Sequence, residues 1–146
     1  MRLLYLRHGD DRGTDIYRHD RQLNDRGRKK ARKAFGELAK KYGHPDTVFV
    51  SPFRRSLRTL EEIATQFKRP VDIHRDPRIA QYVGSKKEPL VSPETAAVIA
   101  FAKRRARIGS SIWCITHQTV IEEVTRCFGM KIPGDLDFLD HVVMLG

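Results

Sequence analysis

The chain has 146 residues, 40% of them hydrophobic, a length and composition that predict one domain, residues 1–146, with a sizeable core. Lys and Arg number 28 against 18 Asp and Glu, so the formal charge is +10 and the pI is near 10.0. This excess favours an anionic partner, such as nucleic acid or a phosphorylated small molecule or protein, although solubility alone also explains a basic surface.

Several protein classes are excluded by what the sequence lacks. Its two cysteines, Cys114 and Cys127, lie in apolar segments outside any cluster of metal ligands, so we expect neither a disulfide framework nor a zinc site. No apolar run approaches the ~20 residues of a membrane span. The run after Met1 is too short for a secretion signal. We therefore expect a reduced, cytoplasmic protein that does not contact a membrane.

The first predicted element is a buried strand. The apolar run over residues 3–6 ends at Arg7-His8-Gly9, as expected of a strand in the middle of a parallel sheet. We expect Gly9 to turn the backbone through a positive φ, which glycine tolerates because it has no Cβ. A polar loop over residues 9–22 follows, and loops of this length are usually functional or mobile.

An amphipathic helix and a second strand come next. Asn24 or Asp25 can cap the helix by accepting backbone N–H groups, and Gly43 is expected to end it. Apolar residues recur at helical spacing up to Tyr42, whereas the opposite face is rich in Lys and Arg, as a solvated face would be. Residues 47–50 then predict a short buried strand.

Ser51 and Pro52 predict the start of a second helix, with the serine as N-cap and the proline in the first turn. The apolar stripe of this helix is expected to comprise Phe53, Leu57, Leu60, Ala64 and Phe67. The remaining predicted elements are a weak strand (70–74), an irregular excursion (75–91), a helix from Ser92, a buried strand (112–115), a helix ended by Gly129 and a last strand (141–145).

Cationic and imidazole side chains follow the ends of three predicted strands. Alternating strands and helices favour a mostly parallel sheet covered on both faces, whose strands end at one edge. Arg7 and His8 follow the first strand, Arg55 lies in the helix after the second, and His117 follows the fourth. Because helical side chains tilt toward the N-terminus, Arg55 should lean toward that edge. We expect these four residues to line one cationic pocket.

Such a pocket suits phosphoryl transfer. Guanidinium groups match phosphate oxygens in a bidentate way, and a neutral imidazole can attack phosphorus and carry the group. Arg7 and Arg55 should lower the pKa of His8, because like charges disfavour its charged form. With two arginines and His117 to neutralise the oxygens, we expect that neither a metal nor another cofactor is required.

The motifs that carry these residues resemble those of the histidine phosphatase superfamily, in the right order and over nearly the whole chain. The matching segments are Arg7-His8-Gly9; Leu23 to Gly27, resembling Leu-Thr-x-x-Gly with Asn24 for Thr; residues 51–59, resembling Ser-Pro-x-x-Arg-Ala-x-x-Thr; and Thr116-His117, resembling Ser-His-Gly with Gln118 for Gly. The resemblance implies a phosphoglycerate-mutase-like fold: an α/β, three-layer α/β/α sandwich with a mostly parallel sheet and one antiparallel strand, assigned to the C-terminal end.

The resemblance also implies roles for single residues. His8 would be the phospho-acceptor, and Arg7, Arg55 and His117 would bind phosphate. The candidate substrate-binding residues on the same motifs and in the excursion are Gly9, Asn24, Ser51 and Gln81.

One position departs from the family pattern. Many members carry a Glu in the excursion after the third strand, where it protonates the leaving oxygen, and Gln81 stands in its place. An alkoxide leaving group needs that proton, whereas imidazole, with a pKa of about 6.5, departs readily. A site without a dedicated acid therefore suits phosphohistidine or another phosphoramidate. Asp10 or Glu88 could substitute as the acid, although Asp10 also suits a role in orienting the loop backbone.

The short chain resembles the SixA-type phosphohistidine phosphatases, whereas phosphoglycerate mutases are longer. We therefore expect a metal-independent phosphatase that acts, through a phosphohistidine on His8, on phosphohistidine of a protein or on a small phosphorylated compound. A general phosphomonoesterase and a non-catalytic binder of phosphorylated ligands or RNA remain alternatives. Nucleic acid is the less expected partner, because aromatic and basic residues do not interleave as in a stacking platform.

Overall fold

A computed structural model describes residues 2–12, 22–80, 110–127, 129–131 and 136–145. Its elements, in chain order, are β1 (Arg2–Arg7), α1 (Asp25–Tyr42), β2 (Thr47–Val50), α2 (Arg54–Ala64), β3 (Asp72–Arg75), the 3-10 helix η1 (Pro77–Ile79), β4 (Ser111–Thr116), α4 (Gln118–Cys127) and β5 (His141–Leu145). The helix predicted from Ser92 and most of the predicted excursion lie outside the described residues.

The five strands form one sheet in the order β3-β2-β4-β1-β5. β1 pairs in parallel with β4, β4 with β2, and β2 with β3, whereas β5 runs antiparallel to β1. The predicted fold class, with a mostly parallel sheet and one antiparallel strand at the C-terminal end, is confirmed. The parallel strands all end at one edge, and the antiparallel β5 begins there, because Leu6 near the end of β1 pairs with His141.

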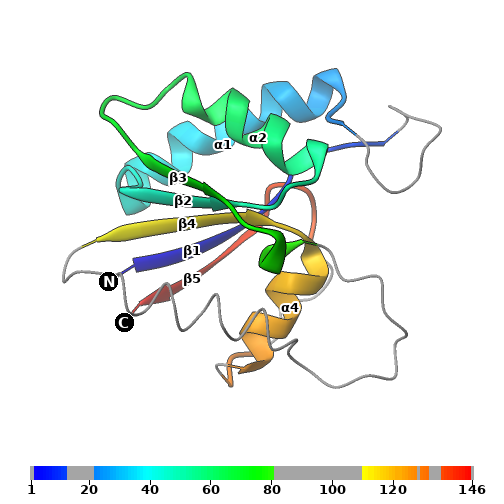
Figure 1. Cartoon of the computed structure of the whole chain (residues 1–146), viewed down its shortest axis with the longest axis vertical. Helices are drawn as coiled ribbons and strands as arrows, with labels where there is room; N and C mark the ends of the chain where they lie inside the picture. The colour runs from blue at the N-terminus through cyan, green and yellow to red at the C-terminus, as the bar shows by residue number, and fades with distance from the viewer. Residues whose placement is uncertain (1, 13–21, 81–109, 128, 132–135, 146) are drawn as a thin grey trace.

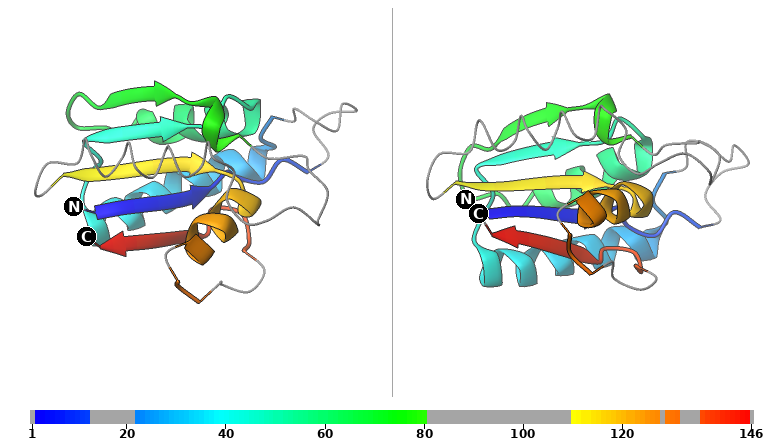
Figure 2. Two further views of the ribbon diagram at one scale, coloured as in Figure 1. Left: turned by 60° about the horizontal axis from the view of Figure 1, so that its bottom comes forward. Right: turned by 90° about the horizontal axis from the view of Figure 1, so that it is seen from below.

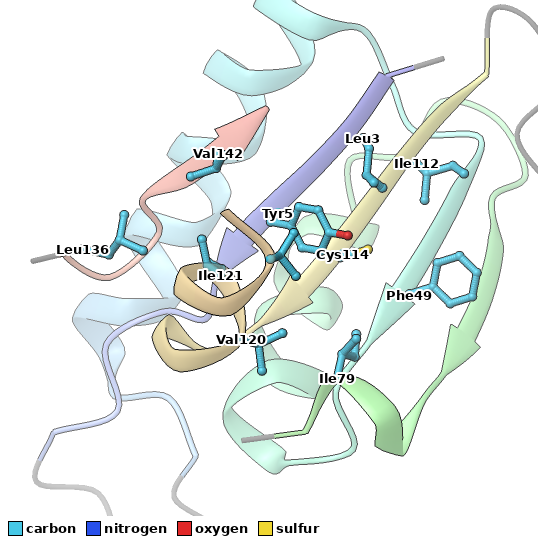
Figure 3. Close-up of a cluster of buried hydrophobic side chains, with 11 residues drawn as sticks. Leu3, Tyr5, Phe49, Ile79, Ile112, Cys114, Val120, Ile121, Leu136 and Val142 are labelled. Carbon is cyan, nitrogen blue, oxygen red and sulfur yellow. The ribbon is translucent and has the colours of Figure 1, made fainter. Parts of the chain in front are cut away.

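Helices cover both faces of this sheet. α1 and α2 lie against one face and α4 lies against the other, as Figures 1 and 2 show. Successive strand residues point to opposite faces. β1 therefore sends Leu4 and Leu6 into the cluster under α1 and α2, and Leu3 and Tyr5 into the cluster under α4 drawn in Figure 3. Among the described residues, none of the helices has both the length and the apolar character that crossing a bilayer requires.

Helix α1 begins and ends as its sequence predicts. The Asn24 side chain accepts a hydrogen bond from the Gly27 N–H at 2.7 Å, so the first of the two predicted caps is confirmed. Gly43 ends the helix at a φ of 83°, which glycine adopts without strain. Ala31, Phe35 and Leu38 are buried against the sheet.

Helix α2 begins later than predicted. Its N-cap is Phe53, which makes no side-chain capping bond, and Arg54 is its first residue. The prediction that Ser51 is the N-cap is wrong, because the cap lies two residues later. The Ser51 hydroxyl accepts a long hydrogen bond from the Phe53 N–H at 3.4 Å and lies 2.8 Å from Nε2 of the His117 ring, so it also holds a histidine.

Most of the predicted stripe of α2 packs against the core. Leu60 is buried together with Ile63, and the partly buried Leu57, Ala64 and Phe67 lie against the same cluster. The first turns lie at the sheet edge where polar groups gather, so polar side chains occupy their inner face. The polar residues buried there are Arg55, Ser56 and Thr59.

Gly9 does not turn the chain through a positive φ, contrary to the prediction. Among the described residues, the glycines with positive φ are Gly43 and Gly129. A Cβ on Gly9 would lie 3.1 Å from a methyl carbon of Leu23 and 3.2 Å from the carbonyl oxygen of Gly27. Close packing, rather than backbone conformation, therefore favours glycine at this position.

Substitution by alanine should have opposite effects on the free energy of unfolding at two glycines of α1. A Cβ on Gly27 would lie 2.4 Å from the carbonyl oxygen of Asp10, so Gly27→Ala should lower the free energy of unfolding by about 2 kcal/mol. A Cβ on Gly36 meets no atom within 4 Å, so Gly36→Ala should raise it by about 1 kcal/mol, because alanine favours the helix. Urea denaturation measures both. Equal effects would contradict the packing of α1 against Asp10.

Candidate active site

Three of the predicted site residues lie in direct contact at the edge where the parallel strands end. His8 follows β1, Arg55 lies in the first turn of α2, and His117 follows β4. Arg55 Nε donates a hydrogen bond to His8 Nε2 at 3.2 Å. The His8 and His117 rings meet edge to face, with centroids 5.2 Å apart. All three side chains are buried, so they form a compact cationic and imidazole cluster.

The His8 ring is held in one tautomer. Its Nδ1 lies 2.8 Å from the carbonyl oxygen of Gly9, which can only accept a hydrogen bond, so Nδ1 carries the proton. In the neutral ring Nε2 then keeps its lone pair, which points at the Arg55 guanidinium. The main chain fixes the residue too, because the His8 N–H donates to the Thr116 carbonyl at 3.0 Å. The ring therefore presents an unprotonated nitrogen to the Arg55 guanidinium.

Burial keeps His8 neutral. Its pKa is lowered to about 3, first by desolvation, with the positive charges of Arg55 and Arg7 adding to the effect. The predicted direction of the shift is confirmed. Burial, however, contributes more than the two arginines to which the prediction attributed it.

His117 is held by the residues that follow β2. Its Nε2 lies 2.8 Å from the Ser51 hydroxyl, and the Phe53 ring meets it edge to face, with centroids 5.3 Å apart. Burial lowers its pKa to about 2, and the neighbouring His8 ring and the two arginines lower it further. Its Nδ1 is buried without a hydrogen-bond partner among the described residues, so it can serve as a contact for a bound ligand.

Each arginine of the site lies against a phenyl ring. The guanidinium carbon of Arg7 lies 4.3 Å from the centroid of Phe138, and that of Arg55 lies 4.9 Å from the centroid of Phe53. Such cation–π contacts use the face of the guanidinium and leave its in-plane N–H groups able to donate to an anion. Arg7 also donates to the carbonyl of Leu136, while its buried Nε has no partner among the described residues.

Sequence reasoning missed the segment before β5. Phe138 contacts Arg7, and its ring centroid lies 5.8 Å from that of His8. Leu139 has a φ of 64°, a region that leucine rarely adopts and that costs roughly 1 kcal/mol or more. The signal that could have located this segment was the antiparallel direction expected of the last strand. A strand that runs opposite to its neighbours must begin where they end, so the residues before it lie at the site.

Asp10 is not suited to donate a proton. Arg12 binds its carboxylate through Nε at 3.0 Å and through a terminal nitrogen at 2.6 Å, and the Arg12 backbone N–H also donates to it. These bonds, chiefly the side-chain one, lower the pKa of Asp10 to about 2. The carboxylate orients the loop backbone, the second role that the sequence suggested. Glu88 and Gln81 lie outside the described residues.

Asp11 is the carboxylate that faces the arginines of the site. Its Oδ2 lies 3.9 Å from Nε of Arg55, the atom that also contacts His8. Burial lowers the pKa of Arg7, and Asp11 is the strongest of the acidic neighbours that oppose this shift. Sequence reasoning singled out Asp10 and passed over Asp11, because nothing in a run of two acids tells which one faces the pocket.

Three predicted substrate-binding residues are occupied by internal contacts. The Gly9 N–H donates to the Thr59 hydroxyl at 2.9 Å. Asn24 uses its oxygen to cap α1 and its amide nitrogen to donate to the Arg12 carbonyl at 3.1 Å. Ser51 contacts His117. These contacts give the three residues a positioning role, and their contact with substrate stays a prediction.

Comparison with known proteins points to one family. The family model of the histidine phosphatase superfamily (branch 1) matches residues 3–84, more than half of the chain. This segment contains the first three motifs on which the resemblance was drawn. No curated protein matches the chain in sequence.

Solved structures share the fold. The protein histidine phosphatase SixA complexed with tungstate aligns over 98% of this chain and 86% of its own, with a TM-score of 0.78 and 23% identity. A mycobacterial glucosyl-3-phosphoglycerate phosphatase with VO3 aligns over 97% of this chain and 91% of its own, with a TM-score of 0.71 and 16% identity. A phosphoserine phosphatase mutant from Entamoeba histolytica, in complex with phosphoserine, aligns over 99% of this chain and 90% of its own, with a TM-score of 0.72 and 14% identity. At these identities the likeness shows the fold.

The two neutral imidazoles should make the protein labile in acid. Their folded pKa values, about 3 and about 2, lie below the value near 6.5 of an unfolded chain, so unfolding takes up protons and stability falls as the pH drops below 6.5. Between pH 6 and pH 5 each should remove about 1 kcal/mol from the free energy of unfolding. His117→Gln should abolish one of these two contributions. Urea titrations at several pH values measure the slope, and an unchanged slope in the variant would contradict a neutral buried His117.

Proposed function

Because the chain belongs to the histidine phosphatase superfamily (branch 1) and is a phosphatase by that membership, we propose that it hydrolyses phosphohistidine through a phosphohistidine intermediate on its own His8. The observation that carries this proposal is the hydrogen bond from Nδ1 of His8 to the Gly9 carbonyl, which leaves Nε2 unprotonated beside Arg55. Two arginines and His117 supply the charge and donors for a phosphoryl group, so we assign no metal to the reaction.

In the first step, Nε2 of His8 attacks phosphorus while the bond from phosphorus to the substrate nitrogen breaks. Arg7 and Arg55 bind the equatorial oxygens through their in-plane N–H groups, and His117 contacts a third. The substrate imidazole takes up a proton from solvent on its far ring nitrogen, near neutral pH, and leaves as a neutral ring. His8 keeps its own Nδ1 proton on the Gly9 carbonyl throughout.

In the second step, water attacks phosphorus and the bond to Nε2 breaks, which releases inorganic phosphate. Because Nδ1 is still protonated, His8 also leaves as a neutral ring. The attacking water must lose a proton, and we assign Asp11 to accept it, since its carboxylate lies beside the arginine that contacts Nε2. Asp10 is already bound by Arg12 through two side-chain hydrogen bonds.

Phosphohistidine is the favoured substrate because the described part of the site offers no ready proton donor. The pKa of Asp10 is lowered, and those of both histidines lie far below neutrality. An alkoxide leaving group would need such a donor, whereas an imidazole that is protonated by solvent does not. We propose that the phosphohistidine is carried by a cytoplasmic protein. A small phosphorylated compound is the coarser alternative, and the similar structures include phosphatases named for small phosphate esters.

Arg55→Ala tests the anion contact. Loss of its N–H donors should lower kcat/KM on a phosphohistidine peptide about 100-fold or more, corresponding to about 3 kcal/mol. Arg58→Ala is the matched control, because Arg58 lies one turn along the same helix but is exposed and paired with Glu61 at 2.6 Å. It should retain wild-type kcat/KM.

The same assay separates the alternatives when phosphoserine is offered beside the phosphohistidine peptide. Turnover of the peptide alone supports the proposal, and equal turnover of both identifies a general phosphomonoesterase. Tight binding of tungstate without turnover of either identifies a non-catalytic binder. Unchanged kcat/KM in Arg55→Ala would refute its role, and a phosphoenzyme that still forms in His8→Asn would refute that of His8.

Asp11→Asn tests the second step by itself. The amide cannot accept a proton from water, so hydrolysis of the phosphoenzyme should slow by about 100-fold while its formation continues. Rapid quenching with labelled substrate should therefore trap acid-labile phosphate on His8. Asp137→Asn is the control, since this exposed carboxylate also faces Arg7 but accepts a hydrogen bond from the Phe138 backbone N–H at 2.8 Å. A variant Asp11→Asn without phosphoenzyme accumulation would show that another group activates the water.

A further inference from the structure

The outward face of α1 carries four cations at helical spacing. Arg26, Lys29, Lys30 and Lys33 follow the pattern i, i+3, i+4, i+7, so they share one face, and all four are exposed. We call these residues the basic stripe. It lies opposite the buried side of α1 and spans about 10 Å of the helix axis.

Helix stability accounts for only part of this arrangement, because Lys29 and Lys33 each stand four residues from an acid of α1, Asp25 and Glu37. Like charges three and four residues apart on a helix repel each other, and cations in the first turns oppose the helix dipole. Lys40 and Lys41 are different, because they lie in the last turn, where the dipole favours a positive charge. Solubility does not require it either, since charges of both signs can be interspersed on a surface. The stripe therefore carries more positive charge than the helix itself favours.

The basic stripe begins at the candidate active site. The N–H of Asn24, the cap of α1, donates to the carbonyl of Asp10 at 3.0 Å, two residues after His8. Gly27 packs against the backbone of the same residue. Figures 1 and 2 show that α1 starts at the edge of the sheet where the parallel strands end. A ligand held on the first turns of α1 can therefore reach the pocket.

We propose that the basic stripe docks an acidic segment of the protein that carries the phosphohistidine. This inference rests on the proposed function. A stripe of about 10 Å spans three residues of an extended chain, so a short run of Asp and Glu near the phosphohistidine can lie along it. Positive charge beside an anion pocket raises the rate at which such a partner is captured.

RNA is the competing occupant, and the stripe lacks what RNA recognition by stacking requires. No aromatic residue lies between Arg26 and Lys33. Bases that are bound without aromatic platforms contribute little beyond backbone charge. An acidic peptide segment, in contrast, needs only the ammonium and guanidinium groups that the stripe presents.

Two triple variants of equal net charge test the proposal. One is Lys29→Gln, Lys30→Gln, Lys33→Gln on the stripe, and the other replaces three exposed cations elsewhere, Lys68→Gln, Arg126→Gln and Lys131→Gln. Each is assayed with phosphoramidate, with a ten-residue phosphohistidine peptide rich in Asp and Glu, and with a peptide in which Ser and Gln replace the acids. Fluorescence anisotropy measures binding of the unphosphorylated acidic peptide and of a single-stranded RNA.

The stripe variant should lose about tenfold or more in kcat/KM on the acidic peptide, together with most of its salt dependence, and stay within about twofold on phosphoramidate and on the neutral peptide. The control variant should keep wild-type values on all three. Equal losses in both variants, or no loss in the stripe variant, would overturn the proposal. Stripe-dependent binding of RNA tighter than that of the peptide would overturn it too. Should the wild type cleave no substrate, the proposed function fails, and anisotropy still decides whether the stripe docks the acidic peptide.

Discussion

The hydrogen bond between the His8 ring and the Gly9 carbonyl is the interaction on which the site depends. It consumes the only proton of a neutral imidazole and thereby leaves the other nitrogen with its lone pair in the pocket. The bond is short-range in sequence, but it holds only because β1 is locked between β4 and β5 and because the next residues pack against α1. The geometry of this local contact is thus fixed by the packing of the whole sheet.

The described part of the site gathers positive charge, with the carboxylate of Asp11 3.9 Å from Nε of Arg55. The imidazoles stay neutral through burial, so they do not add to the repulsion between the arginines. Phenyl rings stabilise the guanidinium faces, and the carboxylate of Asp11 lies to one side of Arg55. The result is a pocket whose donors are oriented before an anion arrives, which is how charge stabilisation becomes effective in phosphoryl transfer.

Alternation of strands and helices was sufficient for a mostly parallel sheet and for the meeting of three site residues. The antiparallel last strand was implied only by the family resemblance. Sequence reasoning failed where local rules compete. Ser51 has the chemistry of a cap, and only the fold shows that its hydroxyl also holds His117. Gly9 was assigned a conformational role, whereas the reason for glycine lies in close packing against Leu23 and Gly27, in another segment of the chain. Phe138 carries no motif at all, and its position follows from the direction of β5.

The antiparallel direction of β5 also places the two ends of the described chain together. Arg2 pairs with Leu145 across neighbouring strands, at the edge of the sheet opposite to His8, and Figure 1 shows the two termini side by side. A surface linkage, a fused reporter or a peptide that joins both ends would thus be attached on the far side of the molecule from the pocket. Circular permutation is accordingly geometrically simple in this fold, with new ends opened at a loop remote from the catalytic edge.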